Sequence, residues 1–209
     1  MKKLLTVLIL FIPCSIYAQL GIKAGFNFAN VTKASSINNS SHSGFNIGIF
    51  LAPPYKKILS SKTELVFSRQ GYNYKTNTNT GKVNLDYIML PQYLCINITK
   101  YFQIHVGAQM AYLLNAKADS TTASGNRGAY SNILNLYNRF EFGVGGGVEV
   151  HPYRGLLIGA RMNVSLGNLY QKPAAGATQP GFVPAVNIKN NLFQLYAGWR
   201  FGKKPSSKK

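Results

Sequence analysis

The acidic residues of this chain are so few that the position of each one carries information. The sequence contains 5 Asp and Glu residues against 23 Lys and Arg residues. Glu64, Glu141 and Glu149 lie in segments where apolar and polar residues alternate, and each occupies the polar parity. Acids on an enclosed face need basic partners, because an unpaired buried charge costs several kcal/mol. We therefore predict a buried network whose stability depends on each acid, with the members Lys23, Glu64, Glu141, Glu149, Arg161 and Arg200.

Other residue types give little sign of catalysis or metal binding. His42 and His151 fall in an expected loop and turn, and His105 lies on a polar parity. Local spacing suggests no Ser, His and acid set, no metal-ligand set and no phosphate-binding motif. The glycine-rich run 143–147 lies inside an alternating segment and lacks the strand-to-helix context of a nucleotide loop. We expect no catalytic residue, metal or cofactor, and a proton or ion path through the acidic network is the alternative.

The alternation that positions these residues is clearest in the segment 138–152. Phe140, Phe142 and Val144 fall on one parity, while Glu141 and Glu149 fall on the other with three glycines. A period of two is that of a β-strand, whose successive side chains point to opposite faces. A small, charged face opposite an aromatic, apolar face suits a wall between a crowded polar lumen and hydrocarbon. A half-buried strand of a soluble sheet fits this single segment equally well.

Similar alternation recurs along the chain, and the connections between the segments alternate in length. The expected strands are 20–31, 44–51, 58–70, 83–96, 102–115, 138–152, 156–167 and 191–201. The long connections are 32–43, 71–82, 116–137 and 168–189, and short turns separate the other strands. This arrangement predicts an all-β fold, an eight-stranded antiparallel up-and-down transmembrane β-barrel with both termini on the short-turn side. The parity is irregular around 88–91, so no faces are assigned in that part of the fourth strand.

Aromatic residues gather near both ends of the expected strands. Transmembrane barrels carry aromatic girdles at the two membrane interfaces, whereas a soluble sheet would bury these residues in its core. We predict one belt near the long loops, formed by Phe26, Phe28, Tyr112, Phe140 and Phe142. We predict a second belt near the short turns, formed by Phe102, Trp199 and Phe201.

The ends of the chain predict export. Residues 1–18 combine Lys2 and Lys3, a short apolar core and a small-residue cleavage site, which is typical of a secretory signal peptide. The barrel then spans 19–202, and 203–209 form a basic tail. After cleavage Cys95 is the one remaining cysteine, so the mature chain has no internal disulfide.

The formal net charge of +18 raises the question of an anionic partner. Nucleic acid is one candidate for such a charge, but the basic residues are scattered singly and the protein is exported, so we expect no nucleic acid. Outer-membrane lipids, including lipopolysaccharide phosphates, are the expected partners. An unknown protein partner at the long loops is a further hypothesis, and we expect a monomer.

Several phrases of the sequence carry a family resemblance. They are the signal ending YAQ, the mature start LGIKAGFNFANV, the segments TELVFSRQGY and LDYIMLPQYL, and the terminal LYAGWRF. Together they resemble the outer-membrane β-barrel proteins of Bacteroidetes, called PorT-like or porin-family proteins. The resemblance implies an OmpA/OmpX-like barrel in the outer membrane of a Gram-negative bacterium, and it supplies no catalytic residues. The chain departs from the family pattern by continuing past the terminal aromatic Phe201.

Three functions follow as hypotheses. The first is a structural or interaction role through the long loops, without catalysis. The second is a small passive porin, against which stands the filled interior of eight-stranded barrels. The third is a soluble exported barrel of lipocalin type that binds an apolar ligand, which would reverse the inner and outer faces.

Overall fold

The computed structural model describes residues 19–31, 40–53, 58–75, 79–122, 127–171 and 188–201. The predicted signal peptide (1–18) and basic tail (203–209) lie outside these ranges, as do most of the predicted loops 32–43 and 168–189. Within the described ranges, no helix is both long and apolar enough to cross a membrane.

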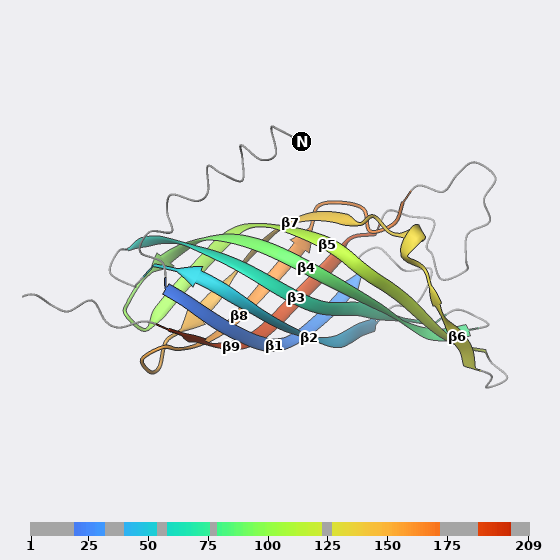
Figure 1. The fold of residues 1–209 in the computed structure, drawn as a ribbon, viewed down its shortest axis with the longest axis horizontal. Coiled ribbons are helices and arrows are strands. Elements are labelled where there is room, and N and C mark those ends of the chain that lie inside the picture. The colour runs from blue at the N-terminus through green and yellow to red at the C-terminus, as the bar shows by residue number, and fades with distance from the viewer. Residues whose placement is uncertain are drawn as a thin grey trace, which may run out of the picture.

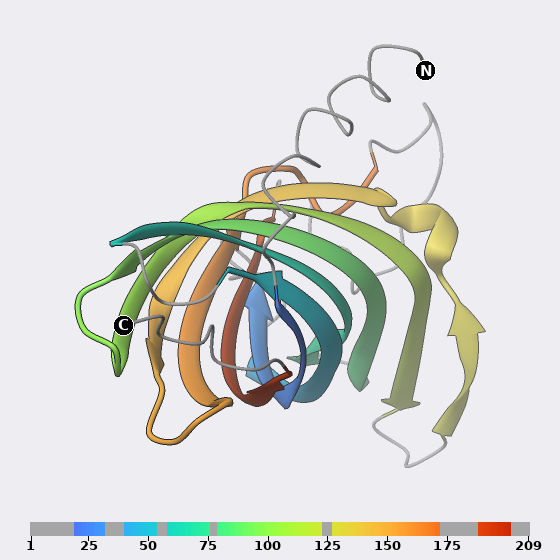
Figure 2. The same cartoon turned by 60° about the vertical axis from the view of Figure 1, so that its left-hand side comes forward.

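Eight antiparallel strands close into a ring (Figures 1 and 2). Each strand pairs with its neighbour in chain order, and the first and last ring strands pair to close the barrel. The predicted fold class, an eight-stranded antiparallel barrel, is therefore confirmed. The ring strands are β1 (Gln19–Val31), β2 (Ser40–Ala52), β3 (Leu59–Lys75), β4 (Asn79–Asn97), β5 (Phe102–Thr122), β7 (Phe140–Val150), β8 (Leu156–Ser165) and β9 (Asn190–Arg200). A ninth strand, β6 (Arg127–Asn132), pairs with the far end of β5, and the 3-10 helix η3 (Leu134–Leu136) follows it.

The barrel is polar inside and apolar outside. On β1, Lys23 and Asn27 are buried, whereas Ile22 and Phe26 are exposed. The same parity holds on the other ring strands, as the alternation of their sequences predicted. A soluble barrel of lipocalin type would need the opposite arrangement, so the face assignment argues against that alternative.

The parity around 88–91 was irregular because β4 carries apolar residues on both faces there, with Met89 inward and Ile88 and Leu90 outward. Leu114 of β5 is an extra residue between the pairs Asp86–Asn115 and Tyr87–Leu113, which is a β-bulge. The bulge shifts the inward parity of β5 from odd-numbered residues such as Leu113 to even-numbered residues such as Ala116, whereas β4 keeps one alternation throughout. Pro91 also interrupts the β3–β4 ladder, since the paired residues skip from Gln92 to Met89 and proline has no N–H to donate.

Strands β3, β4 and β5 run well beyond their predicted ends, toward β6 (Figure 1). The predicted loops 71–82 and 116–137 are therefore wrong over most of their length, because β3 reaches Lys75, β4 starts at Asn79 and β5 reaches Thr122. The alternation continues in these extensions, but their outward residues are polar, so the composition looked like that of a loop. The inward residues of the extensions are buried and mainly apolar: Tyr72, Tyr74, Val83, Leu85, Ala116 and Ala118.

Candidate functional site in the barrel lumen

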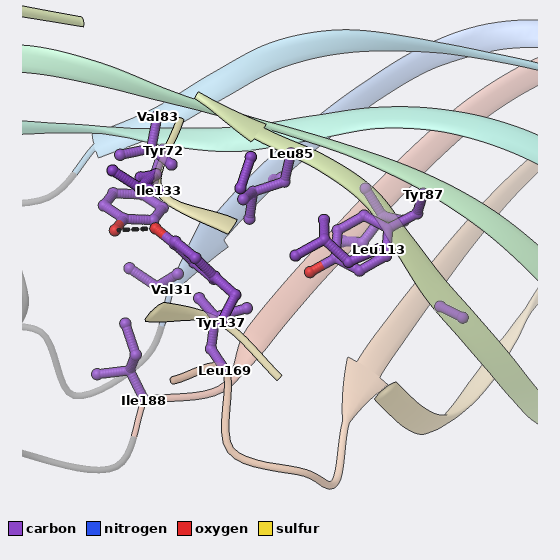
Figure 3. Packing of buried hydrophobic residues seen from close by; sticks show 14 of the residues in the cluster. Val31, Tyr72, Val83, Leu85, Tyr87, Leu113, Ile133, Tyr137, Leu169 and Ile188 are labelled. Atoms are coloured by element: carbon purple, nitrogen blue, oxygen red, sulfur yellow. Dashed lines mark hydrogen bonds between the residues drawn. The ribbon is translucent and has the colours of Figure 1, made fainter. Parts of the chain in front are cut away.

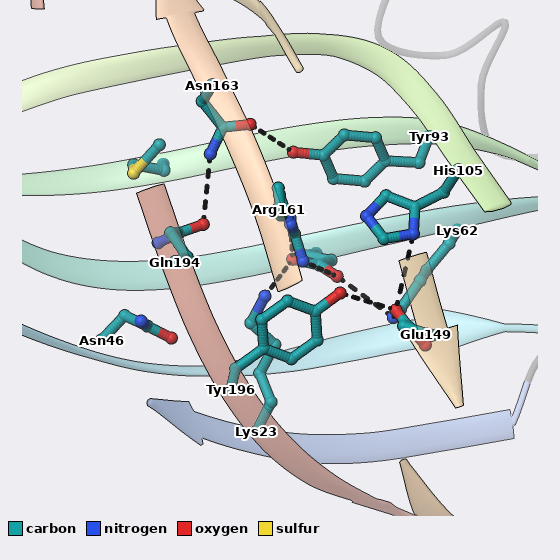
Figure 4. A network of polar contacts seen from close by, with 12 residues as sticks. Lys23, Asn46, Lys62, Tyr93, His105, Glu149, Arg161, Asn163, Gln194 and Tyr196 are labelled. Atoms are coloured by element: carbon teal, nitrogen blue, oxygen red, sulfur yellow. Dashed lines mark hydrogen bonds and ion pairs between the residues drawn. The ribbon is translucent and has the colours of Figure 1, made fainter. Parts of the chain in front are cut away.

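A cluster of three cations and two carboxylates fills the lumen toward the short-turn end (Figure 4). Glu64 lies at its centre. Arg161 donates to both carboxylate oxygens of Glu64, at 2.9 and 3.1 Å, and the Lys23 Nζ atom donates at 2.7 Å. Lys62 completes the set with its Nζ atom 3.3 Å from Glu64 Oε1. All four side chains are at most 1% exposed, so their charges are compensated by one another and not by water.

Glu149 is the second carboxylate of the cluster. Lys62 donates to Glu149 Oε1, and the Tyr196 hydroxyl donates to the same oxygen at 2.9 Å. Two imidazoles lie at longer range, since His105 Nδ1 is 4.0 Å from Oε1 and His151 Nε2 is 3.9 Å from Oε2. Lys62 therefore bridges the two acids.

Aromatic rings pack against the cations of this cluster. The Arg161 guanidinium lies 4.5 Å from the ring centre of Tyr93 and 4.7 Å from that of Tyr196. Lys23 lies over the Tyr196 ring at 4.2 Å, and Lys62 lies over the Phe50 ring at 4.7 Å. Such contacts favour the charged form of each side chain where water is excluded.

The glycines on the inward parity make room for these large side chains. A Cβ atom added at Gly147 would lie 2.7 Å from the Cα atom of Arg161 on the neighbouring strand. At Gly159 it would lie 2.5 Å from the Tyr196 ring. The glycine-rich polar face seen in the sequence is thus the space into which Arg161 and Tyr196 fit.

On the long-loop side of the ionic cluster, amide side chains form a continuous hydrogen-bonded layer across the lumen. The Tyr93 hydroxyl donates to Asn163 Oδ1 at 3.0 Å, and Asn163 donates to Gln194 Oε1 at 3.2 Å. Gln194 and Asn46 both donate to Asn27 Oδ1, at 2.9 and 2.8 Å. This layer joins five ring strands across the middle of the lumen.

The structure brings together four of the six residues of the predicted network: Lys23, Glu64, Glu149 and Arg161. Glu141 is buried on the inward face but takes part in none of the ion pairs of the described residues. Its polar neighbours are Tyr87, Ser165 and Asn190, on the other side of the amide layer. Arg200 lies near the short turns, where its Nη1 atom donates to the Pro53 carbonyl oxygen at 3.1 Å.

Lys62 is the member of the cluster that the sequence reasoning missed. It is 1% exposed and faces inward from β3. A signal was present in the sequence, because Lys62 lies two residues before Glu64 and so shares its parity. Among the described residues, no group of three or more His, Cys, Asp or Glu side chains is placed to hold a metal ion. Cys95 is a buried free thiol on the inward face of β4.

The opposite end of the lumen is closed by an apolar cap (Figure 3). The cap is formed by residues 133–137, 169–170 and 188, which pack on the inner face of the extended strands. The Tyr137 hydroxyl lies 3.1 Å from those of Tyr72 and Tyr170, and burial raises the pKa of Tyr137 well above its usual value. Backbone hydrogen bonds link the cap segments, from Asn138 to Leu169 at 3.0 Å and from Leu169 to Ile188 at 3.0 Å. Segments predicted as loops therefore seal the barrel mouth.

The outer wall carries an apolar band that ends abruptly toward the long-loop end of the barrel. Arg69, Asp86 and Asn115 are cross-strand neighbours on β3, β4 and β5. The outward residues between this row and the short turns are mainly apolar or aromatic, with Ser61, Thr63 and Gln92 as polar exceptions. Along β4 and into the turn that follows it, the outward residues from Ile88 to Ile98 are apolar apart from Gln92, over ten residue steps. At ~3.3 Å per residue and a tilt of about 40°, the band is about 25 Å high, the height found in outer-membrane barrels.

The predicted belt residues lie on this outer wall. Phe102 and Tyr112 are half-buried, and the other six are exposed: Phe26, Phe28, Phe140, Phe142, Trp199 and Phe201. Tyr112 and Phe140 pack edge to face on adjacent strands, with ring centres 4.9 Å apart. Arginines lie over the aromatic rings near the upper edge, Arg69 over Phe45 at 5.5 Å and Arg139 over Tyr112 at 5.2 Å.

Comparisons with known proteins agree with this architecture. A family model described as outer membrane protein beta-barrel domain matches residues 13–171. The structure of Ail, the attachment invasion locus protein of Yersinia pestis, is similar with a TM-score of 0.50 and 15% identity, covering 89% of this chain and 100% of Ail. Neisserial surface protein A (NspA) is similar with a TM-score of 0.51 and 14% identity, covering 87% of this chain and 97% of NspA. At these identities the likeness concerns the fold alone, and no curated protein matches the sequence.

Proposed function

Because the chain belongs to the family of outer membrane protein beta-barrel domains, we propose that it is a closed barrel acting through its long-loop end. The barrel lies in the outer membrane, and its apolar band is the surface that meets lipid. The predicted signal peptide 1–18 would direct export, and the short turns would then face the periplasm while the long-loop end faces the exterior. In this proposal catalysis has no part, and the aromatic belts anchor the barrel at the two interfaces. The Bacteroidetes, PorT-like character implied by the sequence resemblance remains a prediction.

The observation that carries this proposal is the double obstruction of the lumen. The ionic cluster around Glu64 fills one level, and the cap around Tyr137 fills another. Eight-stranded barrels have an interior just wide enough for side chains. A solute would have to displace both a compensated set of buried charges and an apolar cap, which argues against the passive porin.

Conductance of the purified barrel in planar bilayers tests the proposal. Heat-dependent gel mobility would first establish that the preparation is folded. We expect no steady conductance above that of the bare bilayer. The matched control is Tyr137→Ala, which thins the cap but leaves the ionic cluster in place, and it should also remain silent.

Steady conductance by the folded native barrel would contradict the closed lumen and favour the small porin. Recovery of the native protein in the soluble periplasmic fraction, with no heat-dependent shift, would contradict the orientation of its apolar face. The loop-mediated role would then be replaced by ligand binding inside the barrel.

A further inference from the structure

A basic face rises directly from the upper edge of the apolar band. It is the outward face of the extensions of β3, β4 and β5, beyond the Arg69–Asp86–Asn115 row. Lys75, Lys82 and Lys117 are exposed there. We call these three lysines, one from each strand, the lysine ladder.

The register of the sheet arranges the lysine ladder as a diagonal. Lys117 of β5 is paired with Asn84 of β4, and Lys82 lies two residues further along β4. Lys82 is in turn paired with Asn73 of β3, and Lys75 lies two residues further along β3. Each step crosses one strand (~4.8 Å) and two residues (~6.7 Å), so successive Cα atoms are about 8 Å apart.

Acidic residues only partly balance this face. Asp86 is engaged by Arg69, whose Nε atom donates to Asp86 Oδ1 at 2.7 Å and whose Nη2 atom donates to Asp86 Oδ2 at 3.1 Å. Asp119 lies across the strand from Lys82. The described outward face from Arg69 upward carries four basic and two acidic side chains, so its formal charge is +2. The other outward residues described on β4 in these extensions include Thr80 and Asn84, whose side chains can donate hydrogen bonds to oxygen anions.

We propose that the lysine ladder binds the phosphate groups of a phosphorylated glycolipid in the outer leaflet, and this rests on the proposed function. Two observations favour a lipid as the ligand of this face. The face begins at the level where the apolar band ends, so its first basic residues stand where headgroups begin. Its cations continue upward in regular steps, which suits a headgroup that carries several phosphates on a sugar chain. The aromatic rings below Arg69 and beside Arg139 would contact the acyl region of the same layer.

Binding of rough lipopolysaccharide to the folded, detergent-solubilised barrel tests this inference. The test variant is Lys82→Gln with Lys117→Gln. The matched control is Lys100→Gln with Arg154→Gln, two exposed basic residues at the short-turn end. Thermophoresis at a fixed ionic strength of 0.1 M would compare both variants with the native protein, and heat-dependent gel mobility would verify that all three are folded.

We expect the test variant to bind rough lipopolysaccharide about 25-fold more weakly, since a basic residue near an anionic membrane surface contributes about 1 kcal/mol, or a factor of about 5. The control variant should bind as the native protein does, and removal of the phosphates from the lipopolysaccharide should weaken native binding similarly. Equal losses in both variants, or undiminished binding after dephosphorylation, would overturn the proposal. Equally tight binding of soluble dextran sulfate would assign the face to a soluble polyanion instead. If the barrel is silent in bilayers yet the test variant binds normally, this inference fails while the closed-barrel function stands.

Discussion

The Nζ atom of Lys62 lies 3.3 Å from Oε1 of Glu64, and both side chains enter the lumen from the same face of β3. The same Nζ atom also donates to Glu149 of β7 on the far side of the lumen. Lys62 therefore compensates two buried carboxylates that no water reaches. Its position makes it the residue on which the charge balance of the cluster depends.

Replacement of Lys62 by Met should destabilise the barrel by about 3–5 kcal/mol, because it leaves Glu149 without its closest cation. Urea unfolding in detergent, followed by intrinsic fluorescence, would measure the change. Lys100→Met, at an exposed position, is the control and should leave the midpoint unchanged. A normal midpoint for Lys62→Met would mean that the buried carboxylates do not need this lysine.

The two acids Glu149 and Glu141 should respond differently to the same substitution. Glu149→Gln removes a charge that three cationic or imidazole groups approach within 4.0 Å, so it should lower the free energy of unfolding by about 3 kcal/mol. Glu141→Gln keeps the hydrogen-bonding shape and removes a charge with no ion pair among the described contacts. It should therefore change the stability by less than about 1 kcal/mol or increase it. Equal decreases in the free energy of unfolding for both variants, in the same urea titration, would instead support the prediction from the sequence that stability depends on each acid.

Gly147 should tolerate no side chain. Its added Cβ atom would lie 2.2 Å from the Ala160 carbonyl oxygen, closer than such atoms approach. Gly147→Val should therefore prevent assembly, seen as loss of the heat-dependent mobility shift. Gly146→Val is the matched control, since the nearest atom to its added Cβ is 3.3 Å away and the residue faces outward. Normal folding of Gly147→Val would show that the strands can separate to accept a side chain.

His151, just beyond the end of β7, should make the stability depend on pH. Burial lowers its pKa from 6.5 to about 4, outweighing the opposite effect of Glu149. Between these values the unfolded chain binds the proton and the folded barrel does not, so stability rises with pH from about 4 to 6.5 and is lost as the pH falls. Urea midpoints measured from pH 4 to 7 should change less for His151→Asn than for the native barrel. Parallel pH profiles would assign the dependence to other groups.

The sequence was sufficient to predict the eight ring strands, their topology and the direction of most side chains, but not the outlying strand β6. The reason is physical, because lipid outside and crowded polar groups inside impose strict alternation on residues such as Lys23 and Phe26. The extensions of β3 to β5 were missed since the outer environment changes from lipid to water at Arg69, and polar outward residues such as Asn73 then resemble a loop.

Contacts across the lumen could not be read from the sequence. The partners of Glu64 come from β1, β3 and β8, and the ring closure that brings Lys23 and Arg161 to it is a property of the whole barrel. The bulge at Leu114 was equally hidden, because it depends on the registers of two strands. The alternation of the sequence predicts which side chains point into the lumen. Which of these side chains contact one another depends on the closure of the ring.

The pairing of β1 with β9 has a consequence for how the barrel is assembled. The other ring pairs join strands that follow one another along the chain, with β6 as an outgrowth, so they can form as successive hairpins. The β1–β9 seam instead unites the two ends of the ring. Contacts on both faces of the sheet stabilise this seam. Gln194 donates a hydrogen bond to Asn27 on the inner face, and Phe28 packs on Phe193 on the outer face. The ring can therefore close only when the last strand, β9, pairs with the first, β1.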